Sequence, residues 1–178
     1  MSIKILQYPD KRLRRRGYYV GNIKATKIQK CISNMTETLL NAKNCLALAA
    51  TQLDIESPPS IVVFNKNNFD STFHKDGNAI FCLINPEIIS KKNYIDAEEG
   101  CMSISDYNQN PIYMNIKRAD KIKVKGIDTA GNILNFSAEG YFARCIQHEC
   151  DHLNGVLIID YLDNSFNNIV KNKIFQKR

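Results

Sequence analysis

The segment Gln147-His148-Glu149-Cys150-Asp151-His152-Leu153, near the C-terminal end, is the stretch around which we expect the fold to be organised. In a helix, His148 and His152 lie one turn apart on the same face, so both imidazoles can bind one metal ion. Glu149 lies beside them and can transfer protons during hydrolysis. The pattern also arises by chance on helices, but the chain has only three histidines, and two of them fall at this spacing. The segment therefore predicts a metallohydrolase.

A catalytic metal usually takes three protein ligands and leaves one position for water, so the segment requires a third ligand. Downstream of it the chain has no Glu and no His, and Ile158 stands where the extended zinc-protease pattern requires a third histidine. The third ligand is therefore expected upstream, where His74 and the cysteines are the candidates. Cys145 has the apolar neighbours of a core thiol, whereas Cys101 stands out because it follows a glycine in a polar segment.

Three separated segments of the chain carry a family resemblance. They are residues 45–52 (CLALAATQ), 99–103 (EGCMS) and 147–152 (QHECDH). In order and spacing they resemble the three signature motifs of peptide deformylase, and further similarity at residues 8–13, 84–87 and 154–157 extends the resemblance to nearly the whole chain. It implies a single domain over residues 1–178 that removes the formyl group from the N-terminal formyl-methionine of nascent polypeptides, using metal-activated water and releasing formate.

The resemblance also assigns the residues of the site. It implies that the metal ligands are Cys101, His148 and His152. Glu149 is the expected general base, while the side-chain amide of Gln52 and the backbone N–H of Met102 are expected to stabilise the oxyanion. Fe²⁺ is implied as the native metal, with Zn²⁺, Ni²⁺ or Co²⁺ able to substitute. A thiolate with two imidazoles suits iron or zinc, and spacing does not choose between them.

The first motif departs from the family, which usually has glycine where this chain has Cys45 and Ala47. A β-carbon there can restrict the backbone angles or the approach of a substrate, so we expect a narrower cleft or a slower enzyme. One alternative is a weakened descendant that binds N-terminal peptides without turnover. Another is a structural zinc protein, which requires a closed four-ligand site that the sequence does not provide. The resemblance further implies that Glu99 pairs with an arginine, for which Arg118 is the candidate, and that Cys145 borders the methionine pocket.

Composition places the protein among globular domains, with 44% hydrophobic and 24% charged residues in a chain of 178. The six cysteines form no CxxC pair, no signal peptide is apparent and no apolar run reaches membrane-spanning length, so we expect a cytoplasmic protein with no membrane partner. We also expect a monomer. The net charge is +6, but nucleic-acid motifs are absent, and we expect no DNA partner. Association with the ribosome is a hypothesis, against which absent or salt-independent co-sedimentation would argue.

Periodicity predicts an α+β fold, with mixed or antiparallel strands packed around a central metal-binding helix. An N-terminal packing helix is expected at residues 26–43, where four apolar residues recur at helical spacing. Strands are expected at residues 61–64, 80–84, 112–116, 121–125, 133–136 and 156–159. Ser137 is the expected N-cap of the metal helix and Gly155 its stop, and a C-terminal helix is expected from Asn164 onward. His74 is expected in an exposed loop.

Overall fold

The computed structural model describes residues 1–69, 79–106, 108, 110–162 and 174. Five antiparallel strands form one sheet in the order β1-β2-β3-β4-β5. The strands are β1 (Ala47–Ala49), β2 (Ile61–Asn65), β3 (Ile80–Ser105), β4 (Pro111–Ile127) and β5 (Ile133–Glu139). Two α-helices, α1 (Thr26–Asn41) and α2 (Gly140–Leu153), pack on the sheet. The expected α+β fold with antiparallel strands around the metal helix is therefore confirmed.

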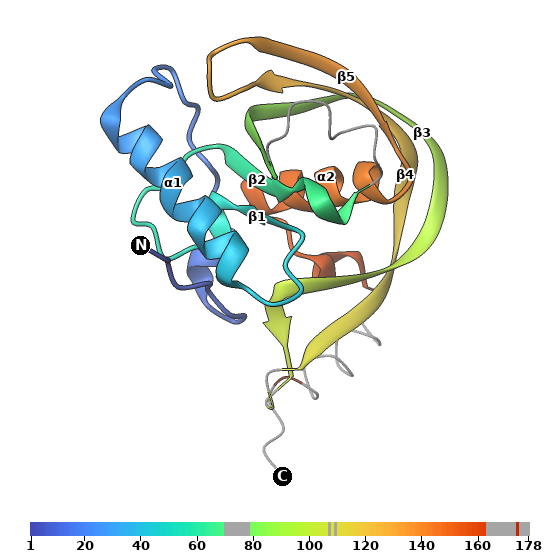
Figure 1. Ribbon diagram of the computed structural model, residues 1–178. Helices are drawn as coiled ribbons and strands as arrows, with labels where there is room; N and C mark the ends of the chain where they lie inside the picture. The colour runs from blue at the N-terminus through green and yellow to red at the C-terminus, as the bar shows by residue number, and fades with distance from the viewer. Residues whose placement is uncertain (70–78, 107, 109, 163–173, 175–178) are drawn as a thin grey trace.

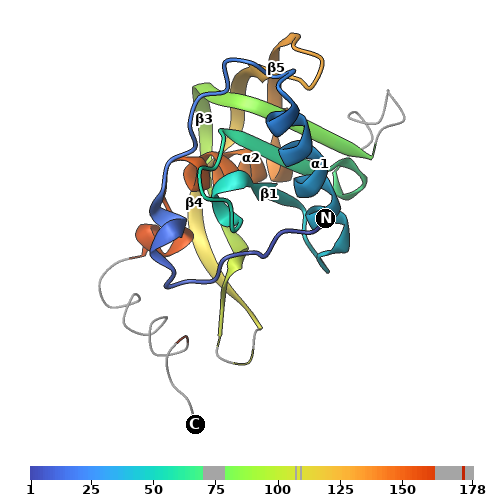
Figure 2. The same cartoon turned by 90° about the vertical axis from the view of Figure 1, so that its left-hand side faces the viewer.

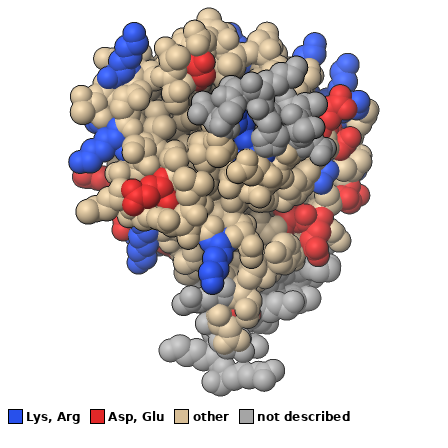
Figure 3. Space-filling model, in the orientation of Figure 1, with Lys and Arg blue, Asp and Glu red and all other residues tan. Residues whose placement is uncertain are grey.

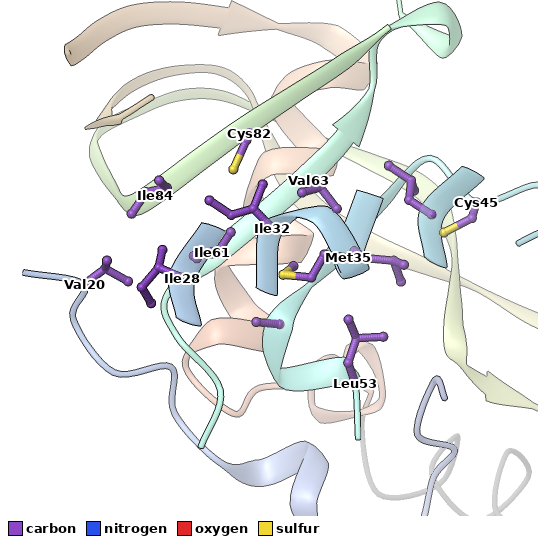
Figure 4. Close-up of a cluster of buried hydrophobic side chains, with 13 residues drawn as sticks. Val20, Ile28, Ile32, Met35, Cys45, Leu53, Ile61, Val63, Cys82 and Ile84 are labelled. Atoms are coloured by element: carbon purple, nitrogen blue, oxygen red, sulfur yellow. The ribbon is translucent and has the colours of Figure 1, made fainter. Parts of the chain in front are cut away.

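The strand β2 is buried on both faces, and it separates the two helices (Figures 1 and 2). Ile61 and Val63 belong to the cluster that α1 covers, where they meet Met35 (Figure 4). Val62 and Phe64 point the other way, into the cluster that contains the inner face of α2. This alternation follows from the period of two along a strand, and the all-apolar run is what a strand buried on both faces requires.

The strands β3 and β4 form one long hairpin that curves around α2 (Figure 1). Their register shifts at three places, Ile84/Glu87, Ile88/Ser90 and Gly100/Ser105, and such irregularities let a strand bend. The expected strand at residues 121–125 is confirmed, with exposed lysines alternating with buried Ile122 and Val124. The expected strands at 80–84 and 112–116 are present but are only the first parts of longer strands, since the pairing of β3 with β4 continues through residues for which no strand was expected.

Helix α2 begins later than expected and ends where expected. Ser137 lies within β5 and is not the N-cap, because strand pairing continues to Glu139 opposite Lys121, and Glu139 precedes the first helical residue. Gly155 follows the helix with a φ of +75°, and its N–H donates to the carbonyl of His152 at 3.0 Å.

The segment after α2 was expected to be a strand, and this is wrong. It forms the short 3₁₀ helix η5 (Ile158–Tyr161), in which the carboxylate of Asp160 accepts from the backbone N–H of Leu157 at 2.8 Å. Its apolar side chains are buried without strand pairing, which is why their composition was misleading. Helix α1 ends at Asn41 rather than residue 43. His74 and the expected helix from Asn164 lie outside the described residues.

Surface charge is interspersed on the face shown in Figure 3, where acidic side chains lie between the lysines and arginines. In the part of the chain that the structure describes, no helix has the length and hydropathy that crossing a membrane requires.

Replacing Gly155 with alanine is expected to destabilise the protein by about 1–3 kcal/mol from the left-handed conformation alone. A β-carbon at this position would also lie 2.4 Å from the carbonyl oxygen of Arg14. Urea unfolding measures the change. Gly21→Ala is the control, because no atom lies within 4 Å of its β-carbon, and it should change stability by less than about 0.5 kcal/mol. Equal effects of the two substitutions would contradict the prediction.

Candidate metal centre

Three buried side chains from two elements meet at the inner face of α2. Cys101 comes from β3, and His148 and His152 come from successive turns of α2. The ligand atoms of the three residues all lie within 4.8 Å of one another. The Nε2 atom of His152 lies 3.2 Å from Cys101 Sγ and 3.2 Å from His148 Nε2. The fold thus brings together the three ligands expected from the sequence, although Cys101 and His152 are 51 positions apart in the chain.

The donor set fits one metal ion. With bonds of about 2.0–2.1 Å to nitrogen and about 2.3 Å to sulfur, tetrahedral ligand atoms lie roughly 3.3–3.6 Å apart. This is close to the 3.2 Å that separates His152 Nε2 from Cys101 Sγ and from His148 Nε2. Burial lowers the pKa of His152 well below its usual value and so favours the neutral ring that binds a metal. Among the described residues, only these three form a group of potential ligands, which disfavours a closed structural zinc site.

Glu149 lies on α2 beside the ligands and is buried, with 4% of its surface exposed. Its Oε2 atom has no hydrogen-bond partner among the described residues. Burial, opposed by the charge of His148, raises the pKa of Glu149 to about 7. A carboxyl with such a pKa and a free oxygen is suited to accept and return a proton near neutral pH.

Gln52 presents its amide NH₂ to the ligand cluster. Its Oε1 accepts from the backbone N–H of Ala49 at 2.9 Å, so Nε2 turns toward Ser103 Oγ, at 3.3 Å, and Cys101 Sγ, at 3.8 Å. Gln52 ends the 3₁₀ helix η2 (Ala50–Gln52), which Thr51 ties to α2 by donating to the carbonyl of His152 at 2.8 Å. The first motif is therefore held directly against the metal helix.

The backbone around Met102 leaves the regular sheet. The β3–β4 pairing is interrupted between Gly100 and Ser105, which frees this stretch from the ladder. The carbonyl of Met102 accepts from Gln7 Nε2 at 2.8 Å, and the N–H of Ser103 donates to Cys101 Sγ at 3.4 Å. Met102 thus lies beside the ligand cluster and lines the cleft that reaches it.

An open cleft of about 690 Å³ is lined by two of the three ligands, Cys101 and His148, and by Glu149. Cys45, Ala47 and Cys145 all line it, which agrees with their expected places. The thiol of Cys45 donates to the carbonyl of Ala47 at 3.3 Å. Within the described part of this loop, the left-handed residue is Asn44, with a φ of 55°, so Cys45 and Ala47 impose no backbone strain and act through the space they fill.

Charged residues behind His148 support the centre. The expected pair is present, with Arg118 Nε donating to Glu99 Oε1 at 2.9 Å, and Glu99 Oε2 lies 3.1 Å from His148 Nδ1. Burial by itself raises the pKa of Glu99, but the hydrogen bonds and charges of these partners outweigh it and lower that pKa below its usual value. Sequence reasoning missed Asp151 and Tyr161, which also contact Arg118. The position of Asp151 three residues after His148, on one helix face, was the available signal for the first of them.

Gln147 opens the metal-helix motif, and the sequence predicts no role for it. Its side chain forms two hydrogen bonds with the backbone of Ala119, donating to the carbonyl at 2.7 Å and accepting from the N–H at 3.1 Å. This arrangement imitates a strand neighbour and fixes α2 against β4. A buried glutamine immediately before the first histidine could have signalled this role.

An α+β fold with a buried Cys-His-His set and a glutamate on the same helix defines a metal-dependent hydrolase. A family model described as polypeptide deformylase matches residues 2–168. The chain is 43% identical over 159 residues to peptide deformylase 1 of Coxiella burnetii, covering 89% of this chain and 86% of that protein. The chain therefore belongs to the polypeptide deformylase family.

Solved structures of the family share the whole fold. A peptide deformylase from Legionella pneumophila superposes with a TM-score of 0.80 at 31% identity, covering 98% of this chain and 94% of that one. A peptide deformylase from Ehrlichia chaffeensis, solved in complex with actinonin, also has a TM-score of 0.80, at 32% identity, covering 98% of this chain and 96% of that one.

Proposed function

We propose that residues 1–178 form a single domain that removes the formyl group from the N-terminal formyl-methionine of nascent polypeptides. One observation carries the proposal. One open cleft brings together the three groups of the site. They are the Cys101-His148-His152 cluster, the free carboxylate oxygen of Glu149 and the amide NH₂ of Gln52. Hydrolysis of an amide requires these groups together: an activated water, a base and a donor for the oxyanion.

Each residue has a defined part in this reaction. A divalent cation bound by Cys101, His148 and His152 would polarise the formyl carbonyl and lower the pKa of water from about 15.7 toward neutrality. Glu149 takes the proton from the attacking water and returns it to the departing amine, which releases formate and a free N-terminal methionine. Gln52 Nε2 and the backbone N–H of Met102 donate to the oxygen on which negative charge develops.

The metal and the cellular setting belong to the same proposal. We infer Fe²⁺ as the native ion, with Zn²⁺, Ni²⁺ or Co²⁺ as substitutes, acting in a cytoplasmic monomer on chains leaving the ribosome. A ligand set of one thiolate and two imidazoles suits either iron or zinc. The actinonin complex of the Ehrlichia chaffeensis relative supports a peptide-like ligand in the cleft.

Formate release from a formyl-methionyl peptide tests the proposal, using protein purified anaerobically and loaded with Fe²⁺, beside a zinc-loaded sample. Release of one formate per free amine supports the reaction. Bound metal without any formate release, together with measurable peptide binding, would favour a descendant that binds peptides without turnover.

Replacing Gln52 with leucine is expected to lower kcat/KM by about 10²–10³-fold, because one oxyanion donor is lost. Gln52→Glu is the companion variant, since it keeps the Oε1 that accepts from Ala49 but loses the NH₂ group. Both should bind metal normally. If Gln52→Glu retained full activity while folded and loaded, Gln52 would not be an oxyanion donor.

Restoring glycine at Cys45 and Ala47 together is expected to raise kcat/KM for formyl-methionyl peptides several-fold, because both side chains line the cleft. Neither residue has a left-handed φ, so the gain would come from space rather than from released strain. Each glycine should cost about 0.5–1 kcal/mol of stability, which a melting curve would record. An unchanged kcat/KM would show that these two residues do not narrow the cleft.

A further inference from the structure

Arg118 is a buried cation that joins β3 to α2. Its side chain is 3% exposed, and every donor with a described partner is directed at an anion or a hydroxyl. Nε and Nη2 donate to the two carboxylate oxygens of Glu99, at 2.9 and 3.1 Å. Nη1 donates to the carboxylate of Asp151 and, at 3.1 Å, to the hydroxyl of Tyr161. A buried charge held this completely has one fixed geometry.

The network ends on a metal ligand. Glu99 Oε2 receives both Arg118 and the Nδ1 of His148, so the position of the carboxylate sets the position of the ring. A proton held on Nδ1 by a carboxylate leaves Nε2 free for the metal. Among the described residues, His152 Nδ1 has no hydrogen-bond partner. The network therefore acts on one of the two histidine ligands.

Tyr161 closes the network from outside. It is the last residue of η5, which lies against β4 and appears in red below α2 in Figure 1. The centre of its ring is 4.7 Å from the guanidinium carbon of Arg118. Its hydroxyl donates to Asp151 Oδ2 at 2.8 Å while accepting from Arg118. The ring is partly exposed although Arg118 is not, so Tyr161 lies between the cation and solvent.

We propose that Tyr161 is a positioning residue for the metal ligand His148, acting through Arg118 and Glu99. The ring holds the plane of the guanidinium by cation–π contact, and the hydroxyl holds Asp151 and Arg118 at a fixed separation. Since Asp151 and His148 lie on the same face of α2, this separation also sets the helix relative to Glu99. The proposal rests on the metal ligands and not on the substrate.

The release of Co²⁺ from the loaded protein to excess chelator tests this proposal, together with the visible spectrum of the bound Co²⁺. Tyr161→Phe removes the hydroxyl and keeps the ring, and Tyr161→Leu removes both. Loss of partners around a metal ligand typically weakens metal binding 10–100-fold, so we expect about tenfold faster release from Tyr161→Phe and faster still from Tyr161→Leu. The Co²⁺ spectrum should shift in both, while the melting temperature of metal-free Tyr161→Phe stays close to that of the parent.

Asp160→Asn is the matched control, because Asp160 holds η5 through Arg14 and Leu157. Equally fast release from Asp160→Asn would overturn the proposal and leave Tyr161 a purely structural part of η5. Release at the parent rate with an unchanged spectrum in Tyr161→Phe would also overturn it. In a Glu99→Gln background, Tyr161→Phe should add little, and a full additional effect would refute the route through Glu99. A parent protein that binds no Co²⁺ would instead refute the metal site.

Discussion

Replacing Glu149 with glutamine is expected to lower kcat/KM for a formyl-methionyl peptide by about 10³–10⁴-fold, the upper part of the range for a general acid–base. Glutamine has nearly the same shape but cannot accept a proton from water. The effect should be large because Glu149 is buried beside the ligands and its Oε2, which has no hydrogen-bond partner among the described residues, is the oxygen that can accept the proton. Formate release by the iron-loaded variant measures the loss, and metal analysis should still find about one ion per chain.

Glu98→Gln is the control for this experiment, because Glu98 lines the same cleft but is exposed. It should retain most of the parent activity. Substantial turnover by Glu149→Gln with normal metal content would show that another group carries the proton, and the proposed mechanism would have to be abandoned.

Replacing Cys101 with alanine is expected to reduce the bound metal from about one ion per chain to nearly none, and formate release with it. Only His148 and His152 would remain as ligands, and two imidazoles do not provide the three protein ligands of a catalytic site. The thiolate also supplies the negative charge that partly neutralises the cation. Elemental analysis after gel filtration measures the loss, and circular dichroism shows whether the fold is kept.

Cys145→Ala provides the control, since Cys145 lines the same cleft but lies outside the ligand group. This variant should keep its metal. If Cys101→Ala retained one tightly bound ion, the third ligand would have to be sought elsewhere, and the arrangement at the centre would need to be revised.

The metal helix shows which features of the site can be predicted from local sequence pattern. The spacing of His148 and His152 gives two ligands on one helix face, because the α-helical period is a property of the backbone alone. The stop at Gly155 was predictable for the same reason, since glycine readily adopts the left-handed conformation there. The start of the helix was not, because pairing of β5 with β4 runs through Ser137 and competes with helix formation.

The long hairpin and the segment after α2 show the opposite limit. No strand was expected in the polar middle of β3, yet pairing with β4 holds these residues in a strand. The apolar residues 156–159 predicted a strand, yet they lead into a 3₁₀ helix whose apolar side chains are buried against the core without any strand partner among the described residues. In both places the outcome depends on neighbours distant in the chain, which composition does not contain.

The sequence by itself determined the chemistry of this protein: the motifs specify a thiolate, two imidazoles, a carboxylate and an amide, and the family resemblance joins them into one site. Apart from the Glu99–Arg118 pair, which the family resemblance also implied, tertiary structure alone decided how that site is supported. Arg118, Asp151 and Tyr161 come from a strand, a helix and a 3₁₀ turn, and they meet only when the chain is folded. The physical reason is that ligand identity follows from residue type and helical period, whereas the geometry around a ligand depends on long-range packing.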